Sequence, residues 1–494
     1  MSKKWRDCST VGKLMIMIGL FVLSPVVVLL YYTDEMHFAS AFFIPSLFSI
    51  GLGLLVCLFS KKRNPYYELS WFDARAYSSW TVIFAWLWGV LIGALPFVFG
   101  GQLRFVQALF EAVSGWTTTG LSAMDVSITP QVYLFHRSFM QYCGGLGFVM
   151  MMIVFIANKH SMDLYSAEGH PDKLMPNIRK TSHIIFFIYN GCLVLGTIAY
   201  MFAGMTLFDG VCHAMCSLST GGFSTKLNSI GEYNSFPIEV ITIVLMLIGT
   251  TNFAALLLLA KGKFGAFFKV SEVRFMFGLL AIVIPLTGLS LMQGLNMSFW
   301  EGQRRAMFDI VSALSTSGYC SMSYVDWPGF AKGAMILMML IGGGIGSTAG
   351  GLKLNRVYLM LRVMILNVKK KLSPINDVEA PYYYKAQGRS SIDDETKEDT
   401  TGFFVTYLLI FILGSLAVTV TADCTLTEAM FDFSSALGTV GLSMGITNPM
   451  TNNATLIVEM MGMLLGRLEI FIVFTGIYSA VHKTKLYIKN HSSK

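Results

Sequence analysis

Four short segments rich in serine, threonine and glycine interrupt the apolar sequence of this 494-residue chain. Each segment closes on a glycine, which is Gly120, Gly222, Gly318 or Gly441. Glycine adopts backbone angles that other residues resist, so it allows the carbonyl groups of a loop to point toward one another. Serine and threonine hydroxyls can hydrogen-bond behind such a loop. Backbone carbonyls gathered in this way can replace the hydration shell of a cation.

The four segments end one phrase that the chain repeats. The copies are LFEAVSGWTTTGLS at 109–122, LFDGVCHAMCSLSTGGFS at 207–224, MFDIVSALSTSGYCS at 307–321 and MFDFSSALGTVGLS at 430–443. Each copy opens on phenylalanine and an acid, and the acids are Glu111, Asp209, Asp309 and Asp432. The acid precedes the glycine by nine residues in three copies and by thirteen in the second. The difference is about one helical turn, so each copy predicts a short helix that starts at the acid.

The acid at each predicted helix start has two interpretations. A carboxylate stabilises the positive N-terminal end by roughly 0.3–1 kcal/mol, and the negative C-terminal end then faces the glycine, where a cation would lie. Alternatively, the acid is only a helix cap, and the small residues only permit close helix packing. Four copies in the same register favour the cation interpretation.

The elements that position these segments are membrane spans. A composition that is 54% hydrophobic and 13% charged excludes an ordinary soluble domain. Crossing a bilayer takes about 20 apolar residues, and ten runs are long enough. They lie at 14–32, 41–60, 79–99, 133–157, 183–204, 236–260, 274–294, 331–364, 402–421 and 454–481. The short phrases between them are expected to be re-entrant, because non-helical backbone at membrane depth must line water or be buried in protein.

The expected fold is therefore an all-α polytopic membrane protein. An N-terminal two-helix hairpin precedes four pseudo-repeats of span, re-entrant pore helix with filter loop, and span, arranged around a central pore. The expected boundaries are 1–66 for the hairpin, 67–160, 161–265, 266–372 and 402–494 for the four repeats, and 373–401 for a cytoplasmic linker. The linker changes sign from basic to acidic, which fits a plain connection or a docking segment.

Lysine and arginine fix the expected orientation, because cytoplasmic loops collect them. Most of the 36 fall in alternate segments, so both termini are expected in the cytoplasm and the location in the cytoplasmic (inner) membrane. The net charge of +7 then reflects topology, with attraction to membrane lipids second, and needs no nucleic-acid partner. Scattered cysteines argue against a disulfide framework. Cys212, His213 and Cys216 lack a fourth metal ligand, which favours packing.

The segment 342–351 and Arg467 are the two exceptional features within spans. Glycine costs about 1 kcal/mol relative to alanine in a helix, so the glycine-rich segment predicts a broken span. It lacks the Gly-Lys-Ser/Thr of a phosphate-binding loop, and no nucleotide is expected to bind this chain itself. An arginine near mid-span costs at least about 2.5–3.5 kcal/mol, so Arg467 should face a cavity or a partner. A local ion pair with Glu469 is weakened because residues two apart on a helix do not face each other.

These motifs together resemble the Trk/Ktr/HKT superfamily of potassium transporters, and most closely its TrkH/TrkG branch. The resemblance rests on the four loops, on GGGIGSTAGGLKLNR at 342–356, on GRLEIF at 466–471 and on the extra N-terminal hairpin. It implies potassium uptake, a homodimer with one pore per subunit, and dependence on a cytosolic TrkA-type nucleotide-binding ring that takes NAD, ATP or ADP. A glycine in every loop favours potassium over sodium.

The resemblance also implies roles for particular residues. The filter residues would be Thr117, Thr118, Thr119 and Gly120; Ser219, Thr220, Gly221 and Gly222; Ser315, Thr316, Ser317 and Gly318; and Gly438, Thr439, Val440 and Gly441. Potassium would bind mainly at the carbonyls of Thr118, Thr119, Thr220, Gly221, Thr316, Ser317, Thr439 and Val440. A gate below the filter would comprise Gly342, Gly343, Gly344, Gly346, Ser347, Thr348, Gly350, Gly351, Lys353 and Arg467. Lys353 is equally well explained as a positive-inside anchor.

The transport mode has two interpretations. A coupled symporter usually carries ionisable groups within its spans, and here only Glu239, Glu459 and Glu469 lie in or at the edges of spans. Gated, channel-like uptake driven by the membrane potential is therefore favoured over proton- or sodium-coupled potassium symport. An enzyme is not expected, because no span carries a His-x-x-x-His or Asp/His cluster.

Overall fold

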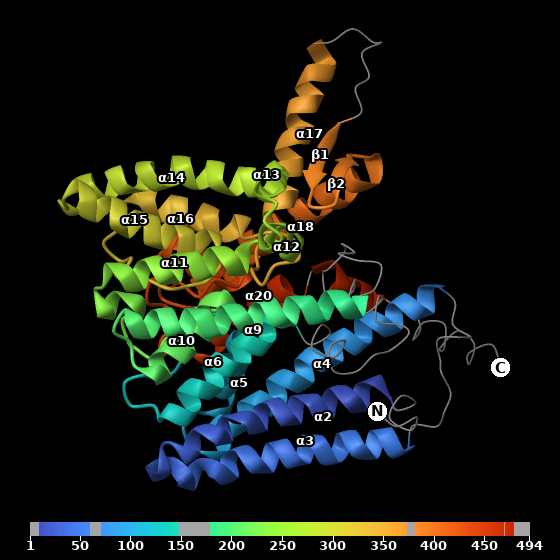
Figure 1. Ribbon diagram of the computed structural model, residues 1–494, viewed down its shortest axis with the longest axis vertical. Helices are drawn as coiled ribbons and strands as arrows, with labels where there is room; N and C mark the ends of the chain where they lie inside the picture. Colours follow the sequence, from blue (N-terminus) through green and yellow to red (C-terminus); the bar gives the residue numbers. More distant parts are fainter. Residues whose placement is uncertain (1–8, 60–70, 148–177, 373–380, 469, 479–494) are drawn as a thin grey trace.

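The computed structural model describes residues 9–59, 71–147, 178–372, 381–468 and 470–478. Two helices, α2 (Thr10–Leu23) and α3 (Ala39–Phe59), form an N-terminal hairpin and pack along each other (Figure 1). Small residues allow the close approach, since a Cβ on Gly12 or Gly19 would lie 2.8 Å from a carbonyl oxygen of α3. The expected hairpin is present among the described residues.

In the described residues, one order of elements then occurs four times: a first helix, a short helix, a loop that contains the glycine shared by the four copies, and a return helix. The first helices are α4 (Trp71–Phe99), α9 (Ile178–Phe202), α14 (Ser271–Leu295) and α18 (Asp394–Thr421). The short helices are α5 (Phe105–Trp116), α10 (Leu207–Leu218), α15 (Phe299–Leu314) and α19 (Leu426–Gly438). The return helices are α6 (Gln131–Leu146), α11 (Phe236–Thr250), α16 (Gly329–Ile341) and α20 (Asn453–Arg467). The described part of the chain is therefore mainly helical, as Figure 1 shows, and the predicted helical fold is confirmed.

Within the described residues, six of the ten predicted spans coincide with helical segments that are long and apolar enough to cross a membrane. They are Thr10–Leu30, Thr33–Phe59, Ser79–Phe99, Ser182–Phe202, Ser271–Leu295 and Asp394–Thr421. The predicted span at 236–260 bends by 114° between α11 and α12 (Phe253–Ala260). The run at 133–157 is helical as far as Leu146 and then leaves the described residues.

Two other predicted spans, 331–364 and 454–481, are interrupted. The run at 331–364 is split into α16 and α17 (Leu354–Leu372), as its glycine content predicts. Gly342 ends α16 with a φ of 69°, an angle that a residue with a Cβ rarely adopts. In the run at 454–481, α20 ends at Arg467 and helix resumes at 470.

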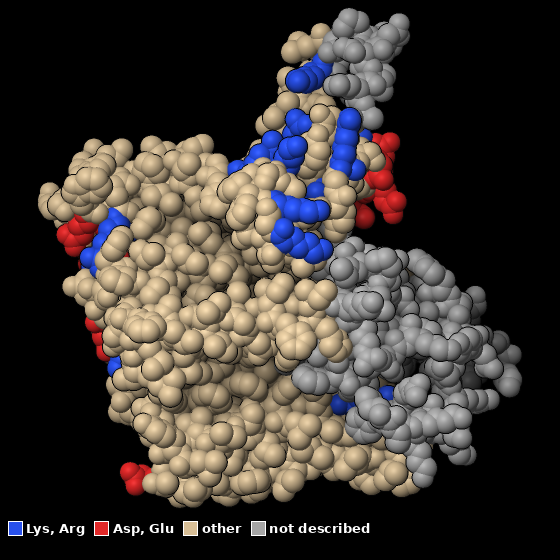
Figure 2. All heavy atoms as spheres, viewed as in Figure 1, with Lys and Arg blue, Asp and Glu red and all other residues tan. Residues whose placement is uncertain are grey.

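Part of the polar linker is structured. The strands β1 (Tyr382–Lys385) and β2 (Gly388–Ser391) pair antiparallel and lie beside α14. A short helix, α13 (Phe264–Lys269), precedes α14. The backbone N–H of Tyr384 donates to Ser271 Oγ at 3.0 Å, which fixes the hairpin to the start of α14. Lysine and arginine gather over α17, this hairpin and the α12–α13 segment in Figure 2, on the side predicted to be cytoplasmic.

Candidate functional site: four glycine loops and the segment beneath them

The four loops at 117–120, 219–222, 315–318 and 438–441, called glycine loops 1 to 4, contact one another in a closed cycle. A Cβ added to the last glycine of any loop would collide with a carbonyl oxygen of the next. The distances are 2.2 Å from Gly120 to Gly221 O, 2.0 Å from Gly222 to Ser317 O, 1.9 Å from Gly318 to Val440 O and 2.2 Å from Gly441 to Thr119 O. Segments more than 300 residues apart in the sequence therefore surround one axis. The carbonyl of the third residue in each loop lies against the last glycine of a neighbouring loop.

The loops also share one backbone conformation. A threonine two residues before the glycine is left-handed in every loop, with φ of 56° at Thr118, 52° at Thr220, 56° at Thr316 and 51° at Thr439. This conformation is rare for a β-branched residue. In loop 1 it forms a Schellman motif, in which Thr119 N donates to Ser114 O and Thr118 N to Gly115 O. Sequence reasoning missed this role, although a threonine recurs at that position in all four copies.

Three of the four acids do not lie where they were predicted. Glu111, Asp309 and Asp432 are interior residues of α5, α15 and α19, so the expectation that each starts its helix is wrong for these three. Their carboxylates accept hydrogen bonds from the segment that follows the glycine. The hydroxyls of Ser122, Ser321 and Ser443 donate to them at 2.7, 2.6 and 2.5 Å. The acids therefore anchor the outgoing chain rather than capping the helix.

The second copy uses a histidine at this position. His213 lies nine residues before Gly222, and its Nε2 is 3.0 Å from Ser224 Oγ, while Nδ1 is 2.8 Å from Asp209 O. Asp209 lies in the first turn of α10 and accepts from Thr225 Oγ1 at 2.5 Å. The longer spacing in this copy thus reflects a histidine in place of the acid. Both ring nitrogens of His213 are engaged, and its ring stacks on Tyr319 at 5.9 Å, which supports the packing interpretation.

The glycine-rich segment 342–353 lies directly against the glycine loops. Gly350 N donates to Thr316 Oγ1 at 2.8 Å, and a Cβ on Gly350 would lie 2.0 Å from Thr439 Oγ1. The Thr348 hydroxyl is 3.2 Å from Leu218 O and 3.1 Å from Thr220 Oγ1. The segment therefore contacts loops 2, 3 and 4 through backbone and hydroxyl groups.

The other predicted gate residues build the turn of this segment. Gly342, Gly346 and Gly351 have φ of 69°, 68° and 77°, and Lys353 is also left-handed at 80°. Two contacts fix the turn to the end of α11: Gly344 N donates to Thr250 O at 2.9 Å, and a Cβ on Gly343 would lie 2.1 Å from Thr250 Oγ1. Within the turn, Ser347 Oγ donates to Gly344 O at 2.7 Å. The Lys353 ammonium donates to the carbonyl of Ala349, within the segment itself.

Arg467 bridges this segment to the first repeat. Its Nη1 donates to Thr348 O at 2.7 Å and its Nη2 to Gly144 O at 2.6 Å. The two carbonyls belong to different elements, the 342–353 segment and the last turn of α6. The family resemblance predicted that Arg467 lies beside the 342–353 segment. Nothing in the sequence predicted its contact with Gly144. Glu469, the alternative partner, lies outside the described residues.

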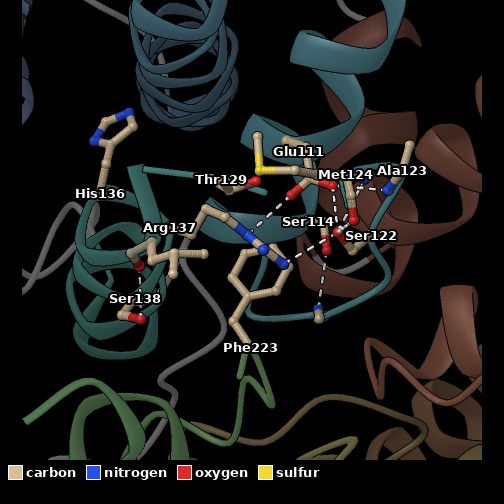
Figure 3. Close-up of polar contacts among 12 residues, drawn as sticks. Glu111, Ser114, Ser122, Ala123, Met124, Thr129, His136, Arg137, Ser138 and Phe223 are labelled. Carbon is tan, nitrogen blue, oxygen red and sulfur yellow. Dashed lines mark hydrogen bonds and ion pairs between the residues drawn. The ribbon is translucent and has the colours of Figure 1, made fainter. Parts of the chain in front are cut away.

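Helix α6 contributes two further side chains that sequence reasoning missed. Arg137 pairs with Glu111, with Nε 3.2 Å from Oε2, and its guanidinium lies 4.0 Å over the ring of Phe223, the residue after Gly222 (Figure 3). Gln141, one turn later, contacts loop 2 itself. Return helix 1 therefore supports the loop of the next repeat as well as its own.

The fold and the four loops define a helical membrane protein organised around one axis. A family model described as cation transport protein, TrkH, matches residues 48–479. The chain therefore belongs to the TrkH family of cation transport proteins, which are transporters and not enzymes.

The similarity to its relatives extends over nearly the whole chain. The chain is 31% identical over 480 residues to the Trk system potassium uptake protein TrkH of Halomonas elongata, covering 94% of this chain and 96% of that protein. It is 28% identical over 493 residues to TrkG of Escherichia coli, covering 94% and 97%. Its structure superimposes on the crystal structure of the potassium transporter TrkH from Vibrio parahaemolyticus with a TM-score of 0.81 and 26% identity, covering 96% and 98%.

Proposed function

We propose that this protein mediates potassium-selective uptake across the cytoplasmic membrane by gated, channel-like conduction. The observation that carries the proposal is the closed cycle of contacts among the four glycine loops. Such a cycle brings four equivalent backbone carbonyls to one axis, which is the arrangement that replaces a cation's hydration shell. The names of the relatives, which are potassium uptake proteins, support potassium as the ion.

The ion ligands in this proposal are the carbonyls of the second and third residues of each loop. Those residues are Thr118 and Thr119, Thr220 and Gly221, Thr316 and Ser317, and Thr439 and Val440. The left-handed threonine and the left-handed glycine flank the third residue in every loop. Alternation of backbone handedness turns successive carbonyls to the same side, which supports stacked carbonyl rings.

The gate is the 342–353 segment, held by Arg467. Its contacts with three glycine loops support an obstruction directly beneath the ion path. The arginine adds a positive charge at that level, which opposes the passage of cations. Release of Thr348 O by Arg467 would free one side of the segment.

Channel-like conduction is favoured over coupled symport because three buried carboxylates, Glu239, Glu111 and Asp309, already have partners. Glu239 pairs with Arg304 at 2.7 Å, and Glu111 pairs with Arg137. Asp309 accepts from Ser321 and Tyr324, at 2.6 and 2.8 Å. Carboxylates engaged in this way are poorly suited to binding and releasing a coupling proton.

The remaining assignments follow the family. The protein would act as a homodimer with both termini in the cytoplasm, regulated by a TrkA-type nucleotide-binding ring, and would bind no nucleotide itself. The basic surface over α17, the β1–β2 hairpin and α12–α13 supports a cytoplasmic docking face (Figure 2). The repeat boundaries of 67–160, 161–265, 266–372 and 402–494 belong to this proposal.

The test is ion flux in vesicles reconstituted with the purified protein, together with growth rescue of a potassium-uptake-deficient strain at low potassium. We expect rubidium, which reports on potassium, to enter with the membrane potential and without a proton or sodium gradient. Uptake that requires either gradient would support the symporter. Absence of rubidium uptake in a correctly assembled protein would overturn the proposal.

A further inference from the structure

Glycine loop 2 differs from the other three at its third residue. The third residues are Thr119, Gly221, Ser317 and Val440, so only loop 2 lacks a side chain there. A Cβ added to Gly221 would lie 2.4 Å from Cδ and 2.5 Å from Oε1 of Gln141. The side chain of Gln141, which comes from α6 of the first repeat, therefore occupies the volume that the loop's own side chain would fill.

The Gln141 amide is engaged at both ends with the backbone around Gly222. Nε2 donates to Gly221 O at 2.5 Å, and Oε1 accepts from Phe223 N at 3.0 Å. The reverse orientation of the amide would face donor with donor and acceptor with acceptor, so the network assigns this orientation. Gln141 is fully buried, and neither bond can be exchanged for one to water.

The carbonyl that accepts from Gln141 belongs to the ring of third-residue carbonyls. Gly221 O lies against Gly120 as Ser317 O lies against Gly222, Val440 O against Gly318 and Thr119 O against Gly441. Within the described residues, Gly221 O is the carbonyl of this ring that accepts a hydrogen bond from a side-chain amide. The positive end of the N–H dipole lies next to the carbonyl oxygen and weakens its attraction for a cation. A ring of lower field strength discriminates against the smaller, more strongly hydrated sodium ion.

Arg137, one helical turn before Gln141 on α6, also supports the chain that follows Gly222. Residues four apart on a helix share a face, so Arg137 and Gln141 both face loop 2. The guanidinium lies over the Phe223 ring and its Nη2 donates to Ser122 Oγ at 3.1 Å, while Glu111 neutralises its charge (Figure 3). Phe223, whose N–H donates to Gln141, is thus held on a second side.

We propose that Gln141 is a specificity-determining residue of this transporter: its amide replaces the missing side chain at Gly221 and tunes one carbonyl of the ion-binding ring toward potassium. This inference rests on the proposed role of the glycine loops as the ion filter. In this proposal, the return helix of the first repeat tunes the filter loop of the second repeat.

The experiment compares rubidium and sodium flux in vesicles containing purified wild-type protein, Gln141→Leu or Gln141→Met. Leucine and methionine keep most of the volume, and neither side chain has a hydrogen-bond donor. We expect the rubidium-to-sodium flux ratio to fall by roughly threefold to tenfold in both variants, the factor that one hydrogen bond contributes. Gln303→Leu is the matched control, since Gln303 also packs on a glycine of another helix, Gly288, but bonds to Pro285 O outside the loops. Its ratio should equal that of the wild type.

A double variant separates tuning from space filling. Gln141→Ala with Gly221→Ser removes the amide and gives loop 2 the same third residue as loop 3, so assembly and flux should return. If the amide sets specificity, the flux ratio stays below that of the wild type. If Gln141 only fills space, the double variant regains the wild-type ratio, and the inference is overturned. It is also overturned if Gln141→Leu assembles with an unchanged ratio. A wild-type protein that shows no preference for rubidium would instead refute the filter itself.

Discussion

Gly222 shows how little room the cycle of glycine loops leaves for a side chain. Its φ is 74°, and a Cβ there would lie 2.0 Å from Ser317 O. Backbone strain of this kind costs about 1–3 kcal/mol, so Gly222→Ser should displace the loop and lower the rubidium-to-sodium uptake ratio by about tenfold. Gly204→Ser is the control, because Gly204 also has a positive φ, 102°, but nothing lies within 4 Å of its added Cβ. An unchanged ratio in Gly222→Ser would argue against the filter.

Arg467 separates charge from hydrogen-bond geometry. Arg467→Ala removes both the positive charge beneath the loops and the bridge from Thr348 O to Gly144 O, so potassium flux per folded protein should increase. Arg467→Lys keeps the charge and loses the planar fork of donors, and its flux should stay closer to that of the wild type. If lysine instead behaves like alanine, the two-carbonyl bridge matters more than the charge. Reduced flux in Arg467→Ala at normal protein levels would contradict the barrier.

At the scale of elements, the 342–353 segment can be displaced by one methyl group. Gly350→Ala would place a Cβ 2.0 Å from Thr439 Oγ1, and the segment must then move away from loop 4. We expect higher basal rubidium flux and less dependence on the cytosolic partner, and we expect the same two effects from a deletion within 343–350. Gly333→Ala on α16 is the control, because its Cβ would meet nothing within 4 Å. Loss of flux with folding intact would make the segment a structural requirement instead of a gate.

The buried pair of Glu111 and Arg137 joins α5 to α6 and is a second test at this scale. Glu111→Gln leaves the arginine charge buried without a counter-ion, which typically costs about 3–5 kcal/mol. The thermal midpoint of the detergent-solubilised protein, followed by size-exclusion chromatography after heating, should fall. Arg137→Met added to Glu111→Gln should restore part of the loss, and Glu301→Gln at the exposed start of α15 should have no effect. A double variant no more stable than the single variant would indicate that the pair is not the cause.

At the scale of the whole molecule, the orientation predicts which surfaces face the medium. Ile128 is 81% exposed in the segment after glycine loop 1, and Lys263 is exposed between α12 and α13. A membrane-impermeant maleimide should label Ile128→Cys in intact cells and Lys263→Cys only after permeabilisation. The parent protein without introduced cysteine gives the background. Labelling of Lys263→Cys in intact cells would show that the predicted orientation is inverted.

The sequence by itself determined the repeated phrase, the long apolar helices and the break in the span at 331–364. These features depend on local hydropathy and on the backbone preferences of glycine, which neighbouring residues report directly. The four glycines were found in this way because each copy carries its own. The left-handed threonines carried a comparable signal in their recurrence, but a β-branched residue is not expected at such angles.

Only the tertiary structure decided which side chains support the loops. The shared phenylalanine–acid pair aligned Asp209 with Glu111, Asp309 and Asp432 in the sequence. In the structure, His213 takes the place of those acids, because it is His213 that contacts the serine after the glycine. Gly144 meets Arg467 across 323 residues of sequence, and Gln141 reaches Gly221 across 80. Hydrogen bonds between distant segments depend on how the helices pack around the axis, and no local pattern encodes that packing.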